Sequence, residues 1–141
     1  MTLYLDTSVL VAAFTHEGST SRVLAWLRAA EAEDLAISDW VTAEFSAALS
    51  LKMRTGQLDE SYRTRAKRLF AEMAAGAVVS LFVKREHFET AAQFADDHKL
   101  ALRAPDALHL AIAAAHDATL VTLDKGMAAA SKVLGVPVRL L

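Results

Sequence analysis

Residues 3–11 have the sequence LYLDTSVLV, which places one carboxylate, Asp6, between two apolar runs. The first run is short and predicts a β-strand, and the second predicts a helix from about Ser8 to Phe14. Asp6 therefore falls at the carboxyl end of a buried strand. Ligands of parallel α/β sheets bind beyond the carboxyl ends of the strands. This stretch favours an α/β fold with Asp6 at its ligand-binding edge.

Outward from this stretch, short apolar runs alternate with helical patterns along the whole chain. Further strands are predicted at residues 35–38, 78–83, 119–123 and 138–141. After the helix at about residues 8–14, a second helix is predicted to begin at about residue 20. Further helices are predicted at residues 39–56, 59–76, 86–98, 105–116 and 126–134. Largely apolar strands separated by helices predict a three-layer α/β/α fold, with a central parallel sheet of about five strands and helices on both faces. The length of 141 residues predicts a single domain, 1–141.

The composition limits the classes of function. The chain has no cysteine, which excludes disulfides and thiolate metal ligands. No apolar run reaches the roughly 18 residues of a membrane span, and no signal peptide is apparent, so we expect a cytoplasmic protein without membrane contact. The net charge is −2, yet a basic strip of six residues lies within 52–68: Lys52, Arg54, Arg63, Arg65, Lys67 and Arg68. The strip is either a solvated helix face or a phosphate-binding surface.

Four carboxylates lie where burial is expected: Asp6, Glu44, Asp106 and Asp124. Asp124 ends an apolar run, Asp106 begins the most hydrophobic helix, and Glu44 shares a helical face with Trp40 and Leu51, as well as with Ala47 and Ala48. Each has an ordinary alternative, as a helix cap or first-turn residue for the aspartates and as a boundary position for Glu44. Burying ionised carboxylates without partners is costly, and a shared cation is the simplest partner.

The type of the ligands indicates which cation this is. Oxygen ligands without cysteine or paired histidine favour Mg²⁺ or Mn²⁺ over zinc. Such ions, held by carboxylates, can activate water and stabilise a leaving oxygen in phosphodiester hydrolysis. The pattern therefore predicts a metal-dependent phosphodiesterase.

Four segments taken together resemble the PIN-domain ribonucleases: residues 5–11, the Ala43-Glu44 pair, residues 105–111 (PDALHLA) and residues 121–124 (VTLD). The chain length and the DALHLA stretch are most similar to the VapC toxin branch. The resemblance covers essentially the whole chain. It implies a Mg²⁺- or Mn²⁺-dependent endoribonuclease with Asp6, Glu44, Asp106 and Asp124 around the metal, and with the Ser8 and Thr122 hydroxyls in support. It also implies a cognate antitoxin and a homodimer as partners.

Other polar residues leave alternatives open. His109, within the apolar helix, is interpreted as a hydrogen-bonded core residue rather than a ligand. Arg103 either contacts substrate phosphate or pairs with a site carboxylate, and Lys52 and Arg54 are further candidate RNA contacts. Two other functions compete with the nuclease, namely a catalytically silent RNA-binding module and a Mg²⁺-dependent receiver-type signalling domain. A receiver site needs an acidic pair near the first strand, and Asp6 has no acidic neighbour.

Overall fold

The computed structural model describes residues 1–141 and has one five-stranded sheet. The strands are β1 (Leu3–Leu5), β2 (Leu35–Ser38), β3 (Val79–Leu81), β4 (Thr119–Thr122) and β5 (Val138–Leu140). Their order in the sheet is β3-β2-β1-β4-β5, and every neighbouring pair is parallel. The predicted parallel sheet is confirmed.

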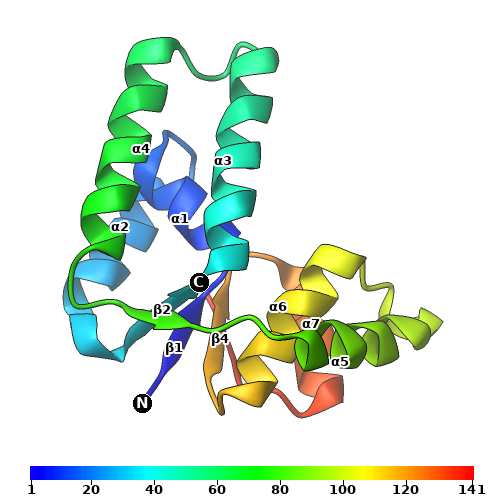
Figure 1. Cartoon of the computed structure of the whole chain (residues 1–141). Coiled ribbons are helices and arrows are strands. Elements are labelled where there is room, and N and C mark those ends of the chain that lie inside the picture. Colours follow the sequence, from blue (N-terminus) through cyan, green and yellow to red (C-terminus); the bar gives the residue numbers. More distant parts are fainter.

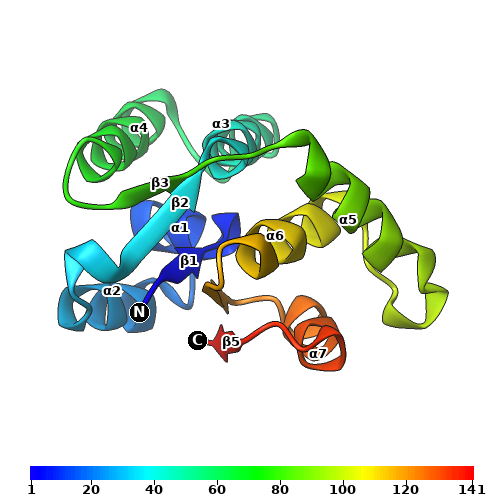
Figure 2. The same ribbon diagram turned by 60° about the horizontal axis from the view of Figure 1, so that its bottom comes forward.

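Seven helices cover the two faces of this sheet. They are α1 (Thr7–Phe14), α2 (Thr20–Ala29), α3 (Asp39–Arg54), α4 (Glu60–Ala74), α5 (Arg85–Asp96), α6 (Ala104–Ala115) and α7 (Lys125–Leu134). Helices α1 to α4 lie on one side of the sheet and α5 to α7 on the other (Figures 1 and 2). This arrangement is the predicted three-layer α/β/α fold. Two short 3₁₀ helices, Ala32–Asp34 and His98–Leu100, were not predicted.

The core explains why the central strands read as continuous apolar runs. All three residues of β1 are buried, because β1 lies at the centre of the sheet with helices on both sides. Helix α6 is buried at every position from Ala107 to Ala113. None of the helices is long and apolar enough to cross a membrane.

The structure corrects the predicted core face of α3. Its buried residues are Val41, Phe45 and Leu49, whereas Leu51 is 52% exposed. The reason is that α3 packs on α1 and α4 rather than only on the sheet. The Phe45 ring stacks on Phe70 of α4 with 4.5 Å between ring centroids and meets Phe14 of α1 edge-on at 6.2 Å. Glu44 consequently lies at the boundary of the core and not at the centre of an apolar stripe.

Helices α3 and α4 form a hairpin that rises from the carboxyl edge of the sheet (Figure 1). Asp59 begins α4, and its carboxylate accepts a hydrogen bond from the backbone N–H of Tyr62 at 2.9 Å. The hairpin turn includes Gly56 at a φ of +73°, which only glycine adopts readily. Because α3 begins directly after β2, its first turn lies at the sheet edge, while most of the basic strip lies further along the hairpin.

Candidate active site

The site is built where β1 and β4, two neighbouring parallel strands, end. Asp6 follows β1, is only 3% exposed, and is the N-cap of α1, so the cap given as its alternative role is present. Its Oδ1 accepts hydrogen bonds from the Ser8 hydroxyl at 2.5 Å and the Val9 amide at 3.3 Å. Its Oδ2 accepts one from the Thr122 hydroxyl at 2.6 Å. The only fully buried carboxylate of the four is thus held at both oxygens.

Ser8 and Thr122 connect the end of β4 to Asp6. The Ser8 hydroxyl accepts a hydrogen bond from the Leu123 amide at 3.1 Å, and the Thr122 hydroxyl accepts one from the Asp124 amide at 2.9 Å. Each hydroxyl therefore donates to Asp6 and accepts from the backbone that follows β4. Both side chains lie at the carboxyl edge of the sheet and orient Asp6.

Glu44 reaches the same edge from α3, where its side chain is 24% exposed. Its Oε1 accepts a hydrogen bond from the Thr7 hydroxyl at 2.8 Å and also contacts Nε2 of His109. Its Oε2 has no hydrogen-bond partner within the protein. Because Trp40 Nε1 is the only buried side-chain nitrogen or oxygen without a partner, Oε2 of Glu44 must be accessible to solvent.

Asp106 and Asp124 line an adjacent pocket of about 360 Å³, together with Arg103 and residues 100–102, 126 and 127. Asp106 lies in the first turn of α6, and its carboxylate makes no hydrogen bond within the protein. Asp124 caps α7, where its Oδ1 accepts a hydrogen bond from the Met127 amide at 2.8 Å. The cap predicted as the alternative role of Asp124 is present, and its Oδ2 remains free.

The charges of these carboxylates act on one another. Burial raises the pKa of Asp6, although the hydrogen bonds from Ser8 and Thr122 oppose the increase. Burial also raises the pKa of Asp106, and the negative charges of Asp124, Glu44 and Asp6 raise it further, although His109 opposes the increase. The other three predicted carboxylates therefore lie within electrostatic reach of Asp106. The site carries more negative charge than the protein neutralises.

The donor chemistry fits a divalent cation, because every ligand is a carboxylate oxygen and the local charge is in excess. The side chains as they stand do not converge on one point: no three histidine, aspartate or glutamate residues are arranged to hold a single ion. Hydrogen bonds within the protein occupy both oxygens of Asp6 and one oxygen each of Glu44 and Asp124, while the other oxygens of Glu44 and Asp124 and both oxygens of Asp106 have no partner. The structure brings the four residues to one edge without closing a coordination shell.

His109 is buried and hydrogen-bonded, as the sequence predicted. The sequence analysis did not predict that Nε2 of His109 contacts Glu44, a candidate metal ligand. The contribution of Thr7 to Glu44 was missed as well. The only signal in the sequence is that His109 lies three residues after Asp106, which puts both on one side of α6.

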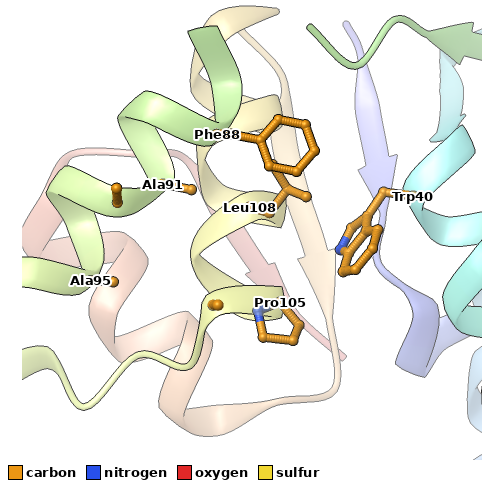
Figure 3. A pocket seen from close by; sticks show the side chains of 8 residues that line it. Trp40, Phe88, Ala91, Ala95, Pro105 and Leu108 are labelled. Carbon is orange, nitrogen blue, oxygen red and sulfur yellow. The ribbon is translucent and has the colours of Figure 1, made fainter. Parts of the chain in front are cut away.

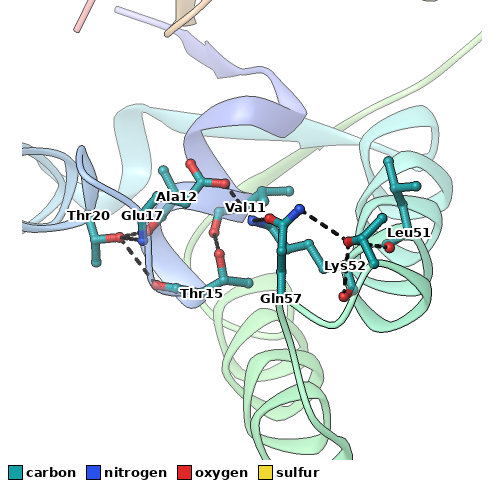
Figure 4. Close-up of polar contacts among 9 residues, drawn as sticks. Val11, Ala12, Thr15, Glu17, Thr20, Leu51, Lys52 and Gln57 are labelled. Carbon is teal, nitrogen blue, oxygen red and sulfur yellow. Dashed lines mark hydrogen bonds and ion pairs between the residues drawn. The ribbon is translucent and has the colours of Figure 1, made fainter.

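The candidate RNA contacts differ in their availability. Lys52 pairs with Glu17 at 2.9 Å and is near Gln57 Oε1 at 3.4 Å, so it connects α3 to the turn after α1 (Figure 4). Arg54 donates to the Ser50 hydroxyl at 3.2 Å. Arg103 is exposed, makes no ion pair and borders the pocket that contains Asp106 and Asp124. Of the three, Arg103 is the cation nearest to the carboxylates and the most available.

An apolar pocket of about 250 Å³ lies between the start of α3 and helices α5 and α6 (Figure 3). Trp40, Phe88 and Leu108 line it, and Phe88 is 54% exposed. The Trp40 indole N–H faces this region without an acceptor (Figure 3). The pocket has the properties of a surface for apolar contacts, and it contains none of the four carboxylates.

The raised pKa of Asp106 predicts how stability depends on pH. In metal-free protein, the ionised form of Asp106 is disfavoured in the folded state. The stability that protonated Asp106 contributes is therefore lost as pH rises from the ordinary pKa of 3.8 through the raised value. We expect Asp106→Asn to melt at a higher temperature than wild type at pH 7, with a difference that shrinks toward pH 4. Melting curves followed by circular dichroism test this expectation.

Asp39→Asn is the matched control, because Asp39 also lies in the first turn of a helix but is exposed. It loses the same favourable interaction with a helix N-terminus and should not gain stability at pH 7. Equal melting temperatures for Asp106→Asn and wild type at pH 7 would show that the ionised Asp106 side chain is not disfavoured in the folded state.

Residues 3–133 match the family described as "PIN domain". No curated protein matches the chain in sequence. Solved structures with the same fold include FitAcB from Neisseria gonorrhoeae, with 24% identity, coverage of 96% of this chain and 95% of that chain, and a TM-score of 0.71. VapC20 from Mycobacterium tuberculosis, a sarcin-ricin loop cleaving toxin, has 18% identity, coverage of 92% and 95%, and a TM-score of 0.72. A toxin-antitoxin complex from Klebsiella pneumoniae has 19% identity, coverage of 88% and 87%, and a TM-score of 0.59.

Proposed function

This chain belongs to the PIN domain family, and from that membership we propose that it is a Mg²⁺- or Mn²⁺-dependent endoribonuclease that hydrolyses RNA phosphodiester bonds. The observation that carries the proposal is the gathering of four carboxylates at one sheet edge, where three of them raise the pKa of the fourth, Asp106. A purely structural role would not favour such an excess of negative charge. A bound divalent cation relieves it.

Each residue has a defined part in this proposal. Asp6, Glu44, Asp106 and Asp124 would hold the metal, directly or through water. Bound there, a divalent ion supplies an activated water and stabilises charge on the phosphodiester. Ser8 and Thr122 are positioning residues, because their hydroxyls donate to Asp6 at 2.5 and 2.6 Å and fix its orientation. Arg103 is suited to bind an RNA phosphate beside the carboxylates.

We extend the proposal to a toxin of a toxin–antitoxin pair that acts in the cytoplasm. Two proteins with the same fold carry the words toxin or toxin-antitoxin in their names. Two apolar surfaces support protein partners: the pocket with Trp40 and Phe88, and a depression lined by Phe14, Leu24 and residues of α4. Apolar surface of this kind is typical of binding sites for protein partners. An antitoxin and a second copy of the chain are the partners that we propose.

The decisive experiment is an RNA cleavage assay with purified protein. We expect internal cleavage of a single-stranded RNA when Mg²⁺ or Mn²⁺ is added. In cells, expression should arrest growth, and co-expression of a small protein encoded by the neighbouring gene should relieve the arrest. If the protein binds RNA but does not cleave it with either Mg²⁺ or Mn²⁺ present, the proposal is contradicted. That result would favour the catalytically silent RNA-binding module.

A further inference from the structure

A row of buried polar side chains runs from the end of β2 to Glu44, and the proposed function does not account for it. The Ser38 hydroxyl lies 2.8 Å from the Tyr4 hydroxyl, and the Tyr4 hydroxyl lies 3.0 Å from Nδ1 of His109. The opposite ring nitrogen, Nε2, contacts Glu44. Ser38, Tyr4 and His109 are each at most 2% exposed. Buried polar groups of this kind are stable only when each finds a partner.

The direction of this hydrogen-bonded row follows from its first member. Ser38 caps α3, and its hydroxyl oxygen accepts a hydrogen bond from the Val41 amide. The only acceptor for the Ser38 hydroxyl proton is the Tyr4 oxygen. Tyr4 must then donate its own proton to Nδ1 of His109, which leaves Nε2 to carry the ring hydrogen toward Glu44. The reverse direction would leave a buried serine hydroxyl without an acceptor, at a cost of about 1–3 kcal/mol.

The row joins four separate elements, since Tyr4 belongs to β1, Ser38 to β2, Glu44 to α3 and His109 to α6. A side chain held from four elements has little freedom to change its rotamer.

We propose that Ser38, Tyr4 and His109 form a directional relay of positioning residues that presents Nε2–H to Oε1 of Glu44. Oε1 also accepts the Thr7 hydroxyl and is thereby fully occupied. The other oxygen, Oε2, makes no hydrogen bond and is accessible, so it is the oxygen left for a ligand role. The catalytic consequence of the relay rests on the proposed nuclease function, whereas the hydrogen-bond direction does not.

The first test measures the direction of the relay in metal-free protein. Long-range ¹H–¹⁵N NMR spectra should show His109 with an unprotonated Nδ1 and a protonated Nε2. In Tyr4→Phe, the Nδ1 resonance should move to the position of a nitrogen that accepts no hydrogen bond, while the signals of His87 stay unchanged. His87 is a suitable internal reference because it is buried in α5 and its Nδ1 accepts a hydrogen bond from the Lys84 amide. A protonated Nδ1 in wild type, with or without a proton on Nε2, would overturn the relay.

The second test compares two substitutions of His109. His109→Gln places an amide N–H close to the position of Nε2, whereas His109→Leu fills similar space without a donor. Loss of a residue that orients a metal ligand typically costs 10–100-fold in activity, so we expect kcat of His109→Leu to fall by roughly that factor while KM for RNA is unchanged. His109→Gln should recover most of kcat. Equal kcat values for the Leu and Gln variants, both folded, would contradict a donor role.

A buried serine elsewhere supplies the matched control for Ser38→Ala. Ser131 is fully buried, and its hydroxyl donates to the Val136 carbonyl in the turn after α7. Ser131→Ala should lose stability without a change in kcat, while Ser38→Ala should lower kcat. A wild-type protein that cuts no RNA would contradict the proposed function alone, because the NMR test of the relay needs neither metal nor substrate. If the wild type cleaves RNA and the relay variants keep its kcat, the result would contradict the relay alone.

Discussion

Asp6→Asn is expected to lower RNA cleavage by at least about 100-fold while the protein stays folded. Substituting residues that merely orient metal ligands typically costs 10–100-fold, and removal of the most buried carboxylate should cost more. Asparagine has the same shape, so the Ser8 hydroxyl and the Val9 amide keep an acceptor, and only the Thr122 hydroxyl loses one. The raised pKa of Asp6 means that its charge is disfavoured by burial in the metal-free state. Thermal stability without metal should therefore be equal to or higher than that of wild type.

Asp59→Asn is the control for the cap that Asp6 also provides. Asp59 is the N-cap of α4 and is exposed, and its cap hydrogen bond to the Tyr62 amide resembles that of Asp6. Its substitution should leave cleavage at the wild-type rate. The measurement is the single-turnover rate on a defined RNA in saturating Mn²⁺. If folded Asp6→Asn cleaves RNA at the wild-type rate, the activity does not arise from the carboxylate site.

Removing the metal is expected to abolish cleavage, and restoring it should stabilise the fold. A ligand that binds only the folded state stabilises it by about 2.7 kcal/mol when its concentration is 100 times Kd. Mn²⁺ should therefore raise the melting temperature of wild type in a saturable manner. Binding of the cation also relieves the repulsion felt by Asp106, which favours binding to the folded state.

The same titration on Asp6→Asn and on Asp39→Asn separates the site from general ion effects. Asp6→Asn should lose most of the Mn²⁺-dependent rise in melting temperature, whereas Asp39→Asn should keep it. Sodium chloride at equal ionic strength controls for screening of surface charge. An identical rise in all three proteins would show that Mn²⁺ binds elsewhere, and full cleavage in excess chelator would show that the reaction needs no metal.

Glu44 shows where the reasoning from the sequence about a helix face was incomplete. Its helical neighbours Trp40 and Leu51 suggested an apolar face, yet the buried face of α3 is that of Val41, Phe45 and Leu49. Hydrophobic periodicity locates a helix and shows that it is amphipathic. Two adjacent faces of the helix, however, are offset by only one position in the sequence. Which stripe is buried depends on the helices opposite, here α1 and α4. Glu44 reaches the site because it lies at the border between the core and the sheet edge.

Local patterns in the sequence are enough to predict the parallel α/β fold and to place Asp6 and Asp124 at the carboxyl ends of strands. Apolar strand runs, helical spacing and carboxylates at strand ends are local patterns, and each arises from residues close together in the chain. How the carboxylates are held depends on tertiary contacts. Glu44 accepts a hydrogen bond from Thr7, 37 positions away, and Tyr4 and His109, which are linked to each other, are 105 positions apart. No local pattern encodes such contacts, because they form only when the packing of α3 and α6 around β1 brings distant side chains within hydrogen-bond distance.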